Sequence, residues 1–483
     1  MVHKFRSIEY KWIVAMIFVV GLFMDLLDTT IVNVALPTLA ANFHSSNAGL
    51  EWVVTAYLLS LAVWIPASGW LGDRFGTKRI FMLALFLFTI GSTLCGEAQS
   101  LHQLVFFRVI QGIGGGMLTP VGTAMLYRAF PPYERAKASA VLVVPVAIAP
   151  TIGPILGGLL VDGPGWRWIF RVNIPIGIIG LAFAWFFLRE NTEDNPGRFD
   201  LPGFVLSGLG LPILLYGISQ GPSKGWGSAE VLVAVIAGVL LLAALVVVET
   251  RTPEPLLALR LFRERLFRTT SIANFMMMGG MIGVIFLLPL FLQQLMGLSA
   301  TQSGLTTFPQ ALGMIVMARA TSRIYPKVGP RRMVMLGMAV TAVLTACFFW
   351  VGLETSQWWI RAIMFGRGLA MGVAMIPLQT AMFSQIERRD SGQASAISQT
   401  NRQVSGSVGV AVLATILAER VKAHMPSGVP TSEAVIKARV DGFHDAYIIG
   451  AVIAALGLIA AYFIHDEDAA ASMSADAKQP AGH

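Results

Sequence analysis

Charged residues are scarce in this chain of 483 residues: Asp, Glu, Lys and Arg together make up 13% of it. A soluble globular protein carries about 25%. Hydrophobic residues make up 55% of the chain, and the mean hydropathy is +0.68. Apolar runs long enough to cross a bilayer recur from one end to the other. The composition therefore excludes a soluble globular protein and predicts a polytopic membrane protein of the all-α class.

Cysteine and histidine are also rare. The two cysteines, Cys95 and Cys347, each lie at the end of an apolar run, and this placement gives neither a disulfide framework nor metal-ligand spacing. The seven histidines complete no catalytic triad with the cysteines or serines. We therefore expect no enzyme activity, no metal site and no bound cofactor.

The net charge of +8 raises the question of nucleic-acid binding. The Lys and Arg residues fall in short loops between apolar runs, however, and the positive-inside bias of membrane proteins explains this placement better. Basic residues precede the first run and follow the second, fourth, eighth, tenth and twelfth. These loops and both termini are therefore predicted to be cytoplasmic. The first run carries two Asp residues and no small-residue cleavage pattern, so we expect it to be retained and not cleaved as a signal peptide.

We count fourteen apolar runs of bilayer-spanning length. They cover roughly residues 12–36, 51–71, 80–98, 104–127, 137–161, 168–188, 202–219, 229–248, 269–293, 304–325, 333–353, 358–383, 396–418 and 445–464. The stretch GWLGDRFGTKR after the second run resembles SRIYPKVGPRR after the tenth. In both, a glycine and paired basic residues join one run to the next, which indicates six helices, two extra helices and six helices. Secondary transporters use such six-helix repeats, with the substrate site between the halves near the midplane.

Four regions follow from this repeat. We expect an N-terminal six-helix bundle over 1–190, two inserted helices with their linkers over 191–250, and a C-terminal six-helix bundle over 251–465. The tail over 466–483 is rich in Ala, Ser and Asp, and is predicted to be disordered and cytoplasmic.

Two carboxylates, Asp25 and Asp28, lie inside the first apolar run. A spacing of three places them on one helix face, and ionisable side chains at membrane depth rarely face lipid. Two carboxylates this close disfavour ionising together, which suits a proton relay. Arg108, in the fourth run, needs a buried partner or a water-filled cavity. These two acids are the nearest in depth, and outward snorkelling is the alternative for Arg108.

The loop after the second run is the strongest candidate for a gate. Gly69 and Gly76 would let two helix ends approach closely. Asp73 would meet the N-terminal end of a helix from the other half. The basic residues Arg74, Lys78 and Arg79 would bind acids across the cytoplasmic gap. The alternative is a tight turn with positive-inside charges, and the second copy lacks the acid, so the working latch is expected in the first half.

The fifth run contains VPVAIAPTIGPILGG. Its prolines are expected to bend the helix, and its glycines to make a thin packing face. Together they would seal the outer end of the cavity and flex between states, and packing without gating is the alternative. These residues are Pro145, Pro150, Gly153, Pro154, Gly157 and Gly158.

Candidate substrate-binding residues are polar or methionine side chains within or beside the apolar runs, because a pliable apolar pocket with few polar anchors accepts many ligands. They are Asn33, Gln111, Met277, Met281, Gln293, Gln310 and Gln379. Simple helix packing is the alternative for the methionines. Arg319, Arg367 and Arg402 lie in or beside runs of the second half, which has no deep acid to match them. These arginines would orient helices, bind substrate or shape the potential around the first-run acids.

Five motifs carry a family resemblance: LDTTIVNVALP, GWLGDRFGTKR, RVIQGIGGG, APTIGPILGG and WRWIFRVNIPIG. In this order they resemble the major facilitator superfamily, and the set looks like its fourteen-helix drug:proton antiporters, the group of the EmrB and QacA exporters. The resemblance covers nearly all of residues 8–465. It implies proton coupling by Asp28, importance of Asp73 and Arg108 for transport, and an exporter from the fifth-run motif. Asp25 departs from the usual pattern, and the later-helix acids of several relatives are missing, which argues against export of strongly cationic drugs.

The residues and the resemblance together predict a proton-coupled antiporter that exports amphipathic small molecules by alternating access, with the proton gradient as its energy source. The alternatives are a proton symporter that imports a small solute and a non-transporting membrane sensor or scaffold. The expected location is the bacterial cytoplasmic (inner) membrane. The expected partners are small amphipathic substrates, protons and the lipid bilayer, without nucleic acid. We expect a monomer, with periplasmic accessory proteins as an option in a Gram-negative cell.

Overall fold

The computed structural model describes residues 9–44, 47–193, 196–426 and 431–474, and every regular element among these residues is a helix. Thirteen of the described helices are long and apolar enough to cross a membrane. The prediction of an all-α polytopic membrane protein is therefore confirmed. The chain forms two compact units, the first of Met1–Tyr216, Ile236–Arg263 and Ile386–Thr400, and the second of Gly217–Val235, Glu264–Gln385 and Asn401–His483.

Among the described residues, the first unit contains eight helices before position 190 and one short later helix. They are α2 (Tyr10–Phe43), α3 (Asn47–Phe75), α4 (Thr77–Glu97), α5 (Leu101–Ala129), η1 (Pro132–Glu134), α6 (Arg135–Asp162), α7 (Trp168–Arg171), α8 (Asn173–Phe187) and η2 (Leu259–Arg263). The second unit contains α11 (Arg265–Gln294), α12 (Ala300–Thr307), α13 (Pro309–Val328), α14 (Pro330–Ala346), η3 (Cys347–Trp350), α15 (Gln357–Ser384), α17 (Ser432–Tyr462), η4 (Glu467–Ala469) and α18 (Ala470–Met473). The helices α9 (Leu201–Lys224), α10 (Ala229–Arg251) and α16 (Ser391–His424) contribute residues to both units.

The predicted region boundaries do not coincide with these two units. The units are defined by contacts between residues, whereas the predicted regions follow position along the chain. The first part of α9 packs on α3, where the rings of Trp52 and Tyr216 stack with centroids 5.8 Å apart. The start of α16 also touches α3: a Cβ on Gly69 would lie 2.7 Å from the carbonyl carbon of Gly392. Both segments therefore belong to the first unit.

The tenth predicted run corresponds to two helices, α12 and α13. The chain breaks between them before Pro309, which begins α13, because proline at a first helical position has no N–H to give to a preceding turn. Arg319 and Arg323 make α13 less apolar than the other long helices. It falls outside the thirteen spanning candidates for this reason, and fourteen crossings stay a prediction.

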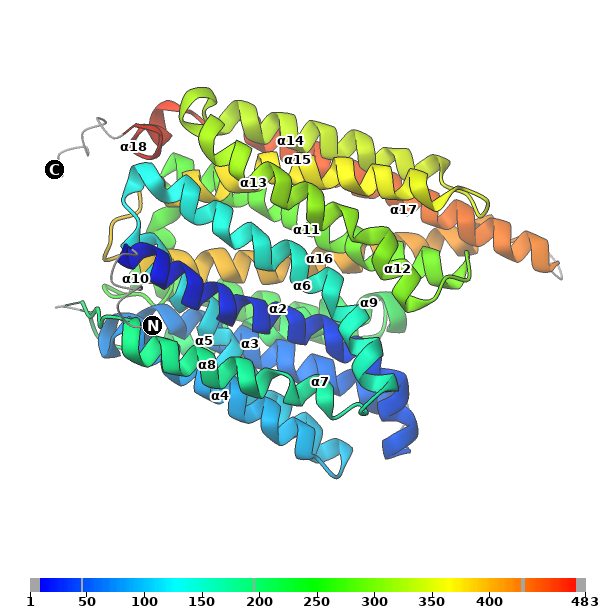
Figure 1. Cartoon of the computed structure of the whole chain (residues 1–483), viewed down its shortest axis with the longest axis horizontal. Coiled ribbons are helices and arrows are strands. Elements are labelled where there is room, and N and C mark those ends of the chain that lie inside the picture. Colours follow the sequence, from blue (N-terminus) through cyan, green and yellow to red (C-terminus); the bar gives the residue numbers. More distant parts are fainter. Residues whose placement is uncertain (1–8, 45–46, 194–195, 427–430, 475–483) are drawn as a thin grey trace. The chain divides into compact units, whose positions relative to one another are not determined.

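Each unit has its own apolar core. In the first unit α5 packs against both α3 and α4, and α2 packs against α6 and α5, as the neighbouring long helices of Figure 1 show. Ile31, Leu39 and Phe170 are fully buried there. In the second unit α15 packs against α13 and α14, and α17 against α11 and α14. Aromatic rings such as those of Phe291 and Phe348 fill its core.

The two related loops have the same backbone geometry. Gly76 precedes α4 with φ 96°, and Gly329 precedes α14 with φ 82°, a conformation that favours glycine. A carboxylate then caps each helix start: Glu190 accepts hydrogen bonds from backbone N–H groups of α4, and Asp466 accepts one from Arg331 at 2.8 Å. The likeness supports the internal repeat inferred from the sequence.

The prediction of a disordered tail is wrong for residues 466–474. Asp466 caps α14, and Ser472 hydrogen-bonds Tyr325 on α13 at 2.6 Å between hydroxyl oxygens. Asp468 pairs with Arg265 at the start of α11 at 2.9 Å. Composition pointed to disorder, but these specific partners hold the segment. Residues 475–483 lie outside the described part of the chain.

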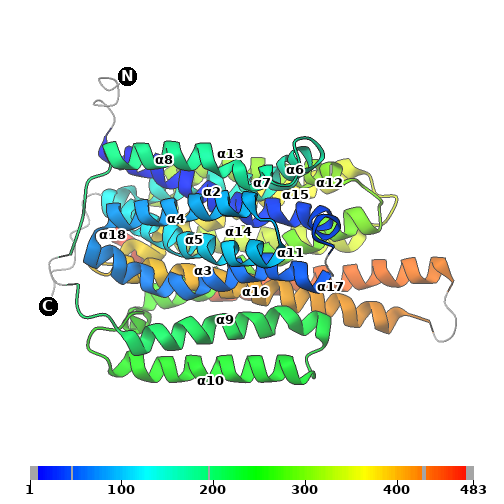
Figure 2. The same cartoon turned by 90° about the horizontal axis from the view of Figure 1, so that it is seen from below.

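The two inserted helices form an antiparallel hairpin, drawn as two green ribbons in Figure 2. A Cβ on Gly238 of α10 would lie 2.7 Å from the Cα of Leu214 on α9, so the helices touch backbone to backbone. Trp64 of α3 packs against Phe204 of α9, with ring centroids 5.7 Å apart. The far side of α10 is apolar and exposed, for example at Val239, as expected for a lipid-facing surface.

Candidate functional site

Asp28 lies in a buried ion pair with Arg108. The Nη1 of Arg108 is 2.5 Å from Oδ2 of Asp28, and the two side chains are 1% and 0% exposed. Gln111, one turn after Arg108 on α5, donates to Oδ1 of Asp28 at 2.8 Å and accepts from Arg108 at 2.8 Å. Arg108 Nε donates to the backbone oxygen of Val53 at 3.0 Å. The expected buried partner of Arg108 is therefore present, and the arginine does not snorkel outward.

Asp25 lies one turn earlier on α2 and is held by hydroxyl groups. Tyr57 on α3 donates to Oδ1 at 2.7 Å, and Thr119 on α5 donates to Oδ2 at 3.0 Å. The ring of Tyr57 also lies under the Arg108 guanidinium, with 4.0 Å from the Cζ to the ring centroid. Tyr57 thus contacts both Asp25 and the guanidinium that pairs with Asp28. It was not among the predicted site residues, because a tyrosine in an apolar run usually indicates helix packing.

The glycine run of α5 explains how these groups come together. A Cβ on Gly112 would lie 2.6 Å from the Cβ of Ser60 on α3, and one on Gly114 would lie 2.4 Å from the backbone nitrogen of Phe88 on α4. These glycines therefore let α5 lie against both neighbours at once. Arg108 enters the core of the first unit on a helix that could not approach with larger side chains.

A second polar cluster lies where α3 and α5 end. Arg128 Nη2 is 2.6 Å from Oδ1 of Asp73, and Arg128 Nε donates to the backbone oxygen of Arg388 at 3.1 Å. The start of α16 follows directly: a Cβ on Gly392 would lie 3.0 Å from Oδ2 of Asp73. The N-terminal end of α16 therefore lies against Asp73, in a segment that belongs to the first unit, whereas the sequence predicted a helix from the other half. Arg128 was not predicted as a site residue, because its position after the fourth apolar run indicated only a positive-inside charge.

The other basic residues of this loop bind differently from the prediction. Arg79 pairs with Glu190, which follows α8 in the same unit, at 3.6 Å. Lys78 donates to the backbone oxygen of Trp185 at 2.7 Å, and Arg74 is exposed. These contacts close the loop onto the end of α8, because Glu190 caps the start of α4. In this structure Lys78 and Arg79 therefore secure the loop within the first unit.

The proline-rich helix α6 packs closely on α2 at two of its three predicted glycines. A Cβ on Gly153 would lie 2.1 Å from Oγ1 of Thr30, and one on Gly157 would lie 3.0 Å from the Cβ of Val34. Among the described residues, no atom outside the backbone of α6 itself lies within 4 Å of the corresponding position at Gly158, so this residue is not part of the packing face on α2. Pro145, Pro150 and Pro154 all lie inside one continuous helix.

This difference predicts the outcome of a matched pair of variants. Gly153→Leu should separate α6 from α2, because its first side-chain atom already overlaps Thr30; overpacking typically costs about 1–3 kcal/mol. Gly158→Leu adds the same side chain where space is open. We expect a lower thermal unfolding temperature and reduced transport for the first variant only, measured in detergent and in vesicles. Equal behaviour of the two would contradict the packing described here.

The predicted substrate-binding residues lie in different surroundings. Gln111 belongs to the Asp28 cluster, and Met277 and Met281 line a cavity in the second unit. Gln310 accepts a hydrogen bond from Arg367 at 3.3 Å. The remaining three residues belong to neither the Asp28 cluster nor the cavity. Asn33 and Gln293 are exposed, and Gln379 donates to Asn274 at 3.4 Å. The structure therefore does not gather the seven residues into one site within either unit, and their roles stay predictions. Among the described residues, no group of three or more His, Cys, Asp or Glu could hold a metal ion.

Comparisons with known proteins find relatives among membrane transporters. A family model described as Major Facilitator Superfamily matches residues 18–410. The "Uncharacterized MFS-type transporter YhcA" of Bacillus subtilis is 35% identical over 84% of this chain and 76% of its own. The "Multidrug resistance protein B homolog" of Mycobacterium tuberculosis is 37% identical over 81% and 73%. The "Putative multidrug resistance protein MdtD" of Yersinia enterocolitica is 32% identical over 92% of each chain.

Solved structures show the same fold. The human organic anion transporter MFSD10 (TETRAN) superposes with a TM-score of 0.65 over 93% of this chain and 99% of its own, at 16% identity. The proton:xylose symporter XylE superposes with a TM-score of 0.61 over 93% and 94%, at 15% identity. At such identities the likeness concerns the arrangement of helices alone.

Proposed function

Because this chain belongs to the major facilitator superfamily, with multidrug resistance proteins among its relatives, we propose that it exports amphipathic small molecules in exchange for protons. It is a multi-pass bacterial membrane transporter of the multidrug type and not an enzyme. The finer proposals are the fourteen-helix drug:proton antiporter group, alternating access, the inner membrane, cytoplasmic termini and a monomeric state.

The buried Asp28–Arg108 pair is the observation that carries the proposal of proton coupling. Two charges this deep are tolerated when they neutralise each other. A proton on Asp28 would remove the negative partner and leave the guanidinium uncompensated. The protonated and deprotonated states therefore favour different surroundings for Arg108, which is what a coupled conformational change requires. Exchange is obligatory if substrate favours the deprotonated state.

Asp25 and Tyr57 extend this mechanism. The Tyr57 hydroxyl is 2.7 Å from Asp25 while its ring lies 4.0 Å from the Arg108 guanidinium. A movement of Arg108 would therefore disturb the hydrogen bond to Asp25. In this proposal the titratable groups of the network are Asp25, Asp28, Tyr57 and Arg108, together with the Cys95 thiol, which donates to Gln111 at 3.7 Å. Asp25 tunes the pH range in which Asp28 releases its proton.

The direction of coupled flux tests the proposal. Purified protein in liposomes would be given an outward substrate gradient without an imposed pH gradient, and the internal pH would be followed with a fluorescent dye. Antiport predicts that substrate leaving the lumen brings protons in and acidifies it. Symport would alkalinise the lumen, and a sensor or scaffold would leave both pools unchanged. Either of these outcomes would overturn the proposal.

The inserted hairpin should take no part in substrate binding. Leu214 and Val239 lie on α9 and α10, outside both six-helix repeats. Cysteines placed at these positions should react with membrane-permeant thiol reagents at the same rate with and without saturating substrate. Cys95 and Cys347 would first be replaced by alanine to give a silent background. Strong protection by substrate at either position would contradict this division of labour.

A further inference from the structure

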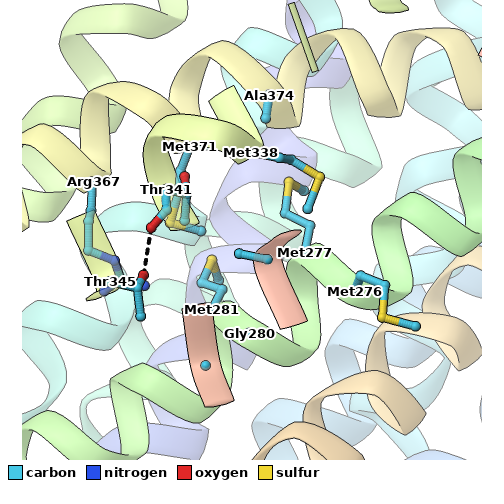
Figure 3. Close-up of a pocket in the computed structure, with 12 residues that line it drawn as sticks. Met276, Met277, Gly280, Met281, Met338, Thr341, Thr345, Arg367, Met371 and Ala374 are labelled. Atoms are coloured by element: carbon cyan, nitrogen blue, oxygen red, sulfur yellow. Dashed lines mark hydrogen bonds between the residues drawn. The ribbon is translucent and has the colours of Figure 1, made fainter. Parts of the chain in front are cut away.

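A small cavity lies inside the helix bundle of the second unit. It is lined from four helices, α11, α14, α15 and α17. Methionines form much of its wall, and the guanidinium-bearing side chain of Arg367 extends into it beside Thr345, as Figure 3 shows. Its free volume of about 10 Å³ is close to the minimum that holds a single water-sized particle.

Arg367 is buried there without a carboxylate. Its relative exposure is 1%, and none of the described acids lies within 4 Å of its nitrogens. Its Nη1 donates to Gln310 at 3.3 Å and contacts the sulfur of Met364 at 3.8 Å, both neutral groups. Its Nε has no hydrogen-bond partner. A buried charge with such weak partners is costly unless a counterion completes the site.

The internal repeat shows where a counterion would belong. Asp28 lies nine residues before Pro37 on α2, and Gly280 lies nine residues before Pro289 on α11. Tyr57 lies nineteen residues before Gly76, as Gln310 does before Gly329. Gln111 and Arg367 both lie eleven residues after a capping serine, Ser100 and Ser356.

The second unit therefore has polar groups at two positions of the first-unit cluster and lacks its carboxylate. The same spacing places Met364 at the position of Arg108. The polar positions of the Asp28 cluster recur as a guanidinium on α15 and an amide on α13. The position of the carboxylate is Gly280, which lines the cavity. A Cβ there would meet Ile453 at 3.6 Å and the backbone oxygen of Gly450 at 3.9 Å, which are ordinary contacts. The cavity therefore lies at the position that corresponds to the Asp28 carboxylate of the first unit.

We infer that a halide-sized monovalent anion binds Arg367 in this cavity and replaces the missing carboxylate. The size of the cavity excludes a drug-sized group. Chloride is larger than water, so its binding requires the flexible methionine side chains of the wall to move outward slightly, and the same side chains offer polarisable surface to a weakly hydrated anion. Chloride is the halide that cells supply in quantity. This site lies within one helix bundle and is distinct from the proton-coupling carboxylates of the first unit.

Chloride-dependent stability of the purified full-length protein tests the inference. The thermal unfolding temperature would be measured in sodium chloride and in sodium gluconate of equal ionic strength, because gluconate is too large for the cavity. Wild type should be more stable in chloride, with a saturable response. Arg367→Met, which removes the charge but keeps a long side chain, should lose the response. The exposed Arg319→Met should keep it.

Two substitutions at Gly280 test the proposed role of the anion as a counterion more directly than the arginine variants. Gly280→Asp places a carboxylate where the repeat lacks one, so it should remove the chloride response by supplying the counterion internally. Gly280→Asn has the same shape without the charge, and should not supply it. Binding of radioactive chloride to wild type, lost in Arg367→Met and in Gly280→Asp, would confirm the site directly. Equal stability of wild type in chloride and gluconate, without chloride binding, would mean that the cavity holds water, and would overturn the inference even if a Gly280 variant failed to fold.

Discussion

Asp28→Asn should abolish proton-driven export. The change removes the only carboxylate within 4 Å of the Arg108 nitrogens in the described chain, and asparagine cannot cycle a proton. It also leaves a guanidinium of 1% exposure without a counterion, and breaking a buried pair in this way costs about 3–5 kcal/mol. Drug efflux from cells that lack their own pumps, and pH-driven uptake into everted vesicles, should both fall to the level of empty membranes.

A matched double variant separates loss of coupling from loss of folding. Asp28→Asn with Arg108→Gln removes both charges together, so neither member of the pair is left as an uncompensated ion. We expect this protein to elute as a single species from a sizing column, with restored thermal stability, and still to show no proton-coupled transport. Asp25→Asn should be milder, shifting the pH optimum while transport continues. Full transport by Asp28→Asn under a pH gradient would remove the basis of the proposed mechanism.

The parts of this site that could be predicted from the sequence follow from one fact: burying a charged side chain in the membrane costs free energy. Asp25, Asp28 and Arg108 are charged residues inside apolar runs, and a charge at that depth needs a partner. The three residues lie at similar positions along their apolar runs, and this was sufficient to predict that they interact. Which acid takes the arginine was open, and the structure assigns Asp28 because Gln111, one turn from Arg108, reaches the same carboxylate.

The parts that the sequence did not predict depend on contacts between distant segments. Arg128 looked like a positive-inside charge, and only the fold brings it to Asp73, 55 positions earlier. Asp466 lies in a stretch whose composition suggests disorder, yet it caps a helix that begins at Pro330. Neither partner could be found from local pattern, because hydrogen-bond partners across a fold leave no periodic signal in the chain.

The proposed latch at the ends of α3 and α5 consists of Asp73, Arg128 and the backbone of Arg388. Asp73 accepts from Arg128 at 2.6 Å, and Arg128 also donates to the backbone oxygen of Arg388. Nearby, Arg260 pairs with Asp390 at 2.6 Å. Arg128 and Asp73 are 3% and 10% exposed as side chains, so this pair is better shielded from water than an ordinary surface salt bridge. It joins the first repeat to the segment that leads into α16.

Asp73→Asn should weaken this contact without changing the proposed proton site. The neutral amide leaves Arg128 with the more distant carboxylate of Glu193, 3.6 Å away, as its remaining acid. A latch contact of about 1–3 kcal/mol would change the ratio of two conformational states by about 5–150-fold. In the proposed cycle the cytoplasmic side is closed in the outward-open state, so the variant should populate inward-open protein. Transport should fall because the outward-open state becomes rare, whereas substrate binding from the cytoplasmic side should survive.

Distances between spin labels at the cytoplasmic ends of the two repeats would measure this shift, with substrate binding followed in the same samples. Glu97→Gln is the matched control: Glu97 pairs with Arg171 at 2.7 Å, but the pair is exposed and lies at the end of α4 away from the latch. Its loss should leave both the distances and transport near wild type. Lost transport in Asp73→Asn with an unchanged distance distribution would show that Asp73 acts by a route other than closure, because a latch that stabilises one state must change the populations when it is weakened.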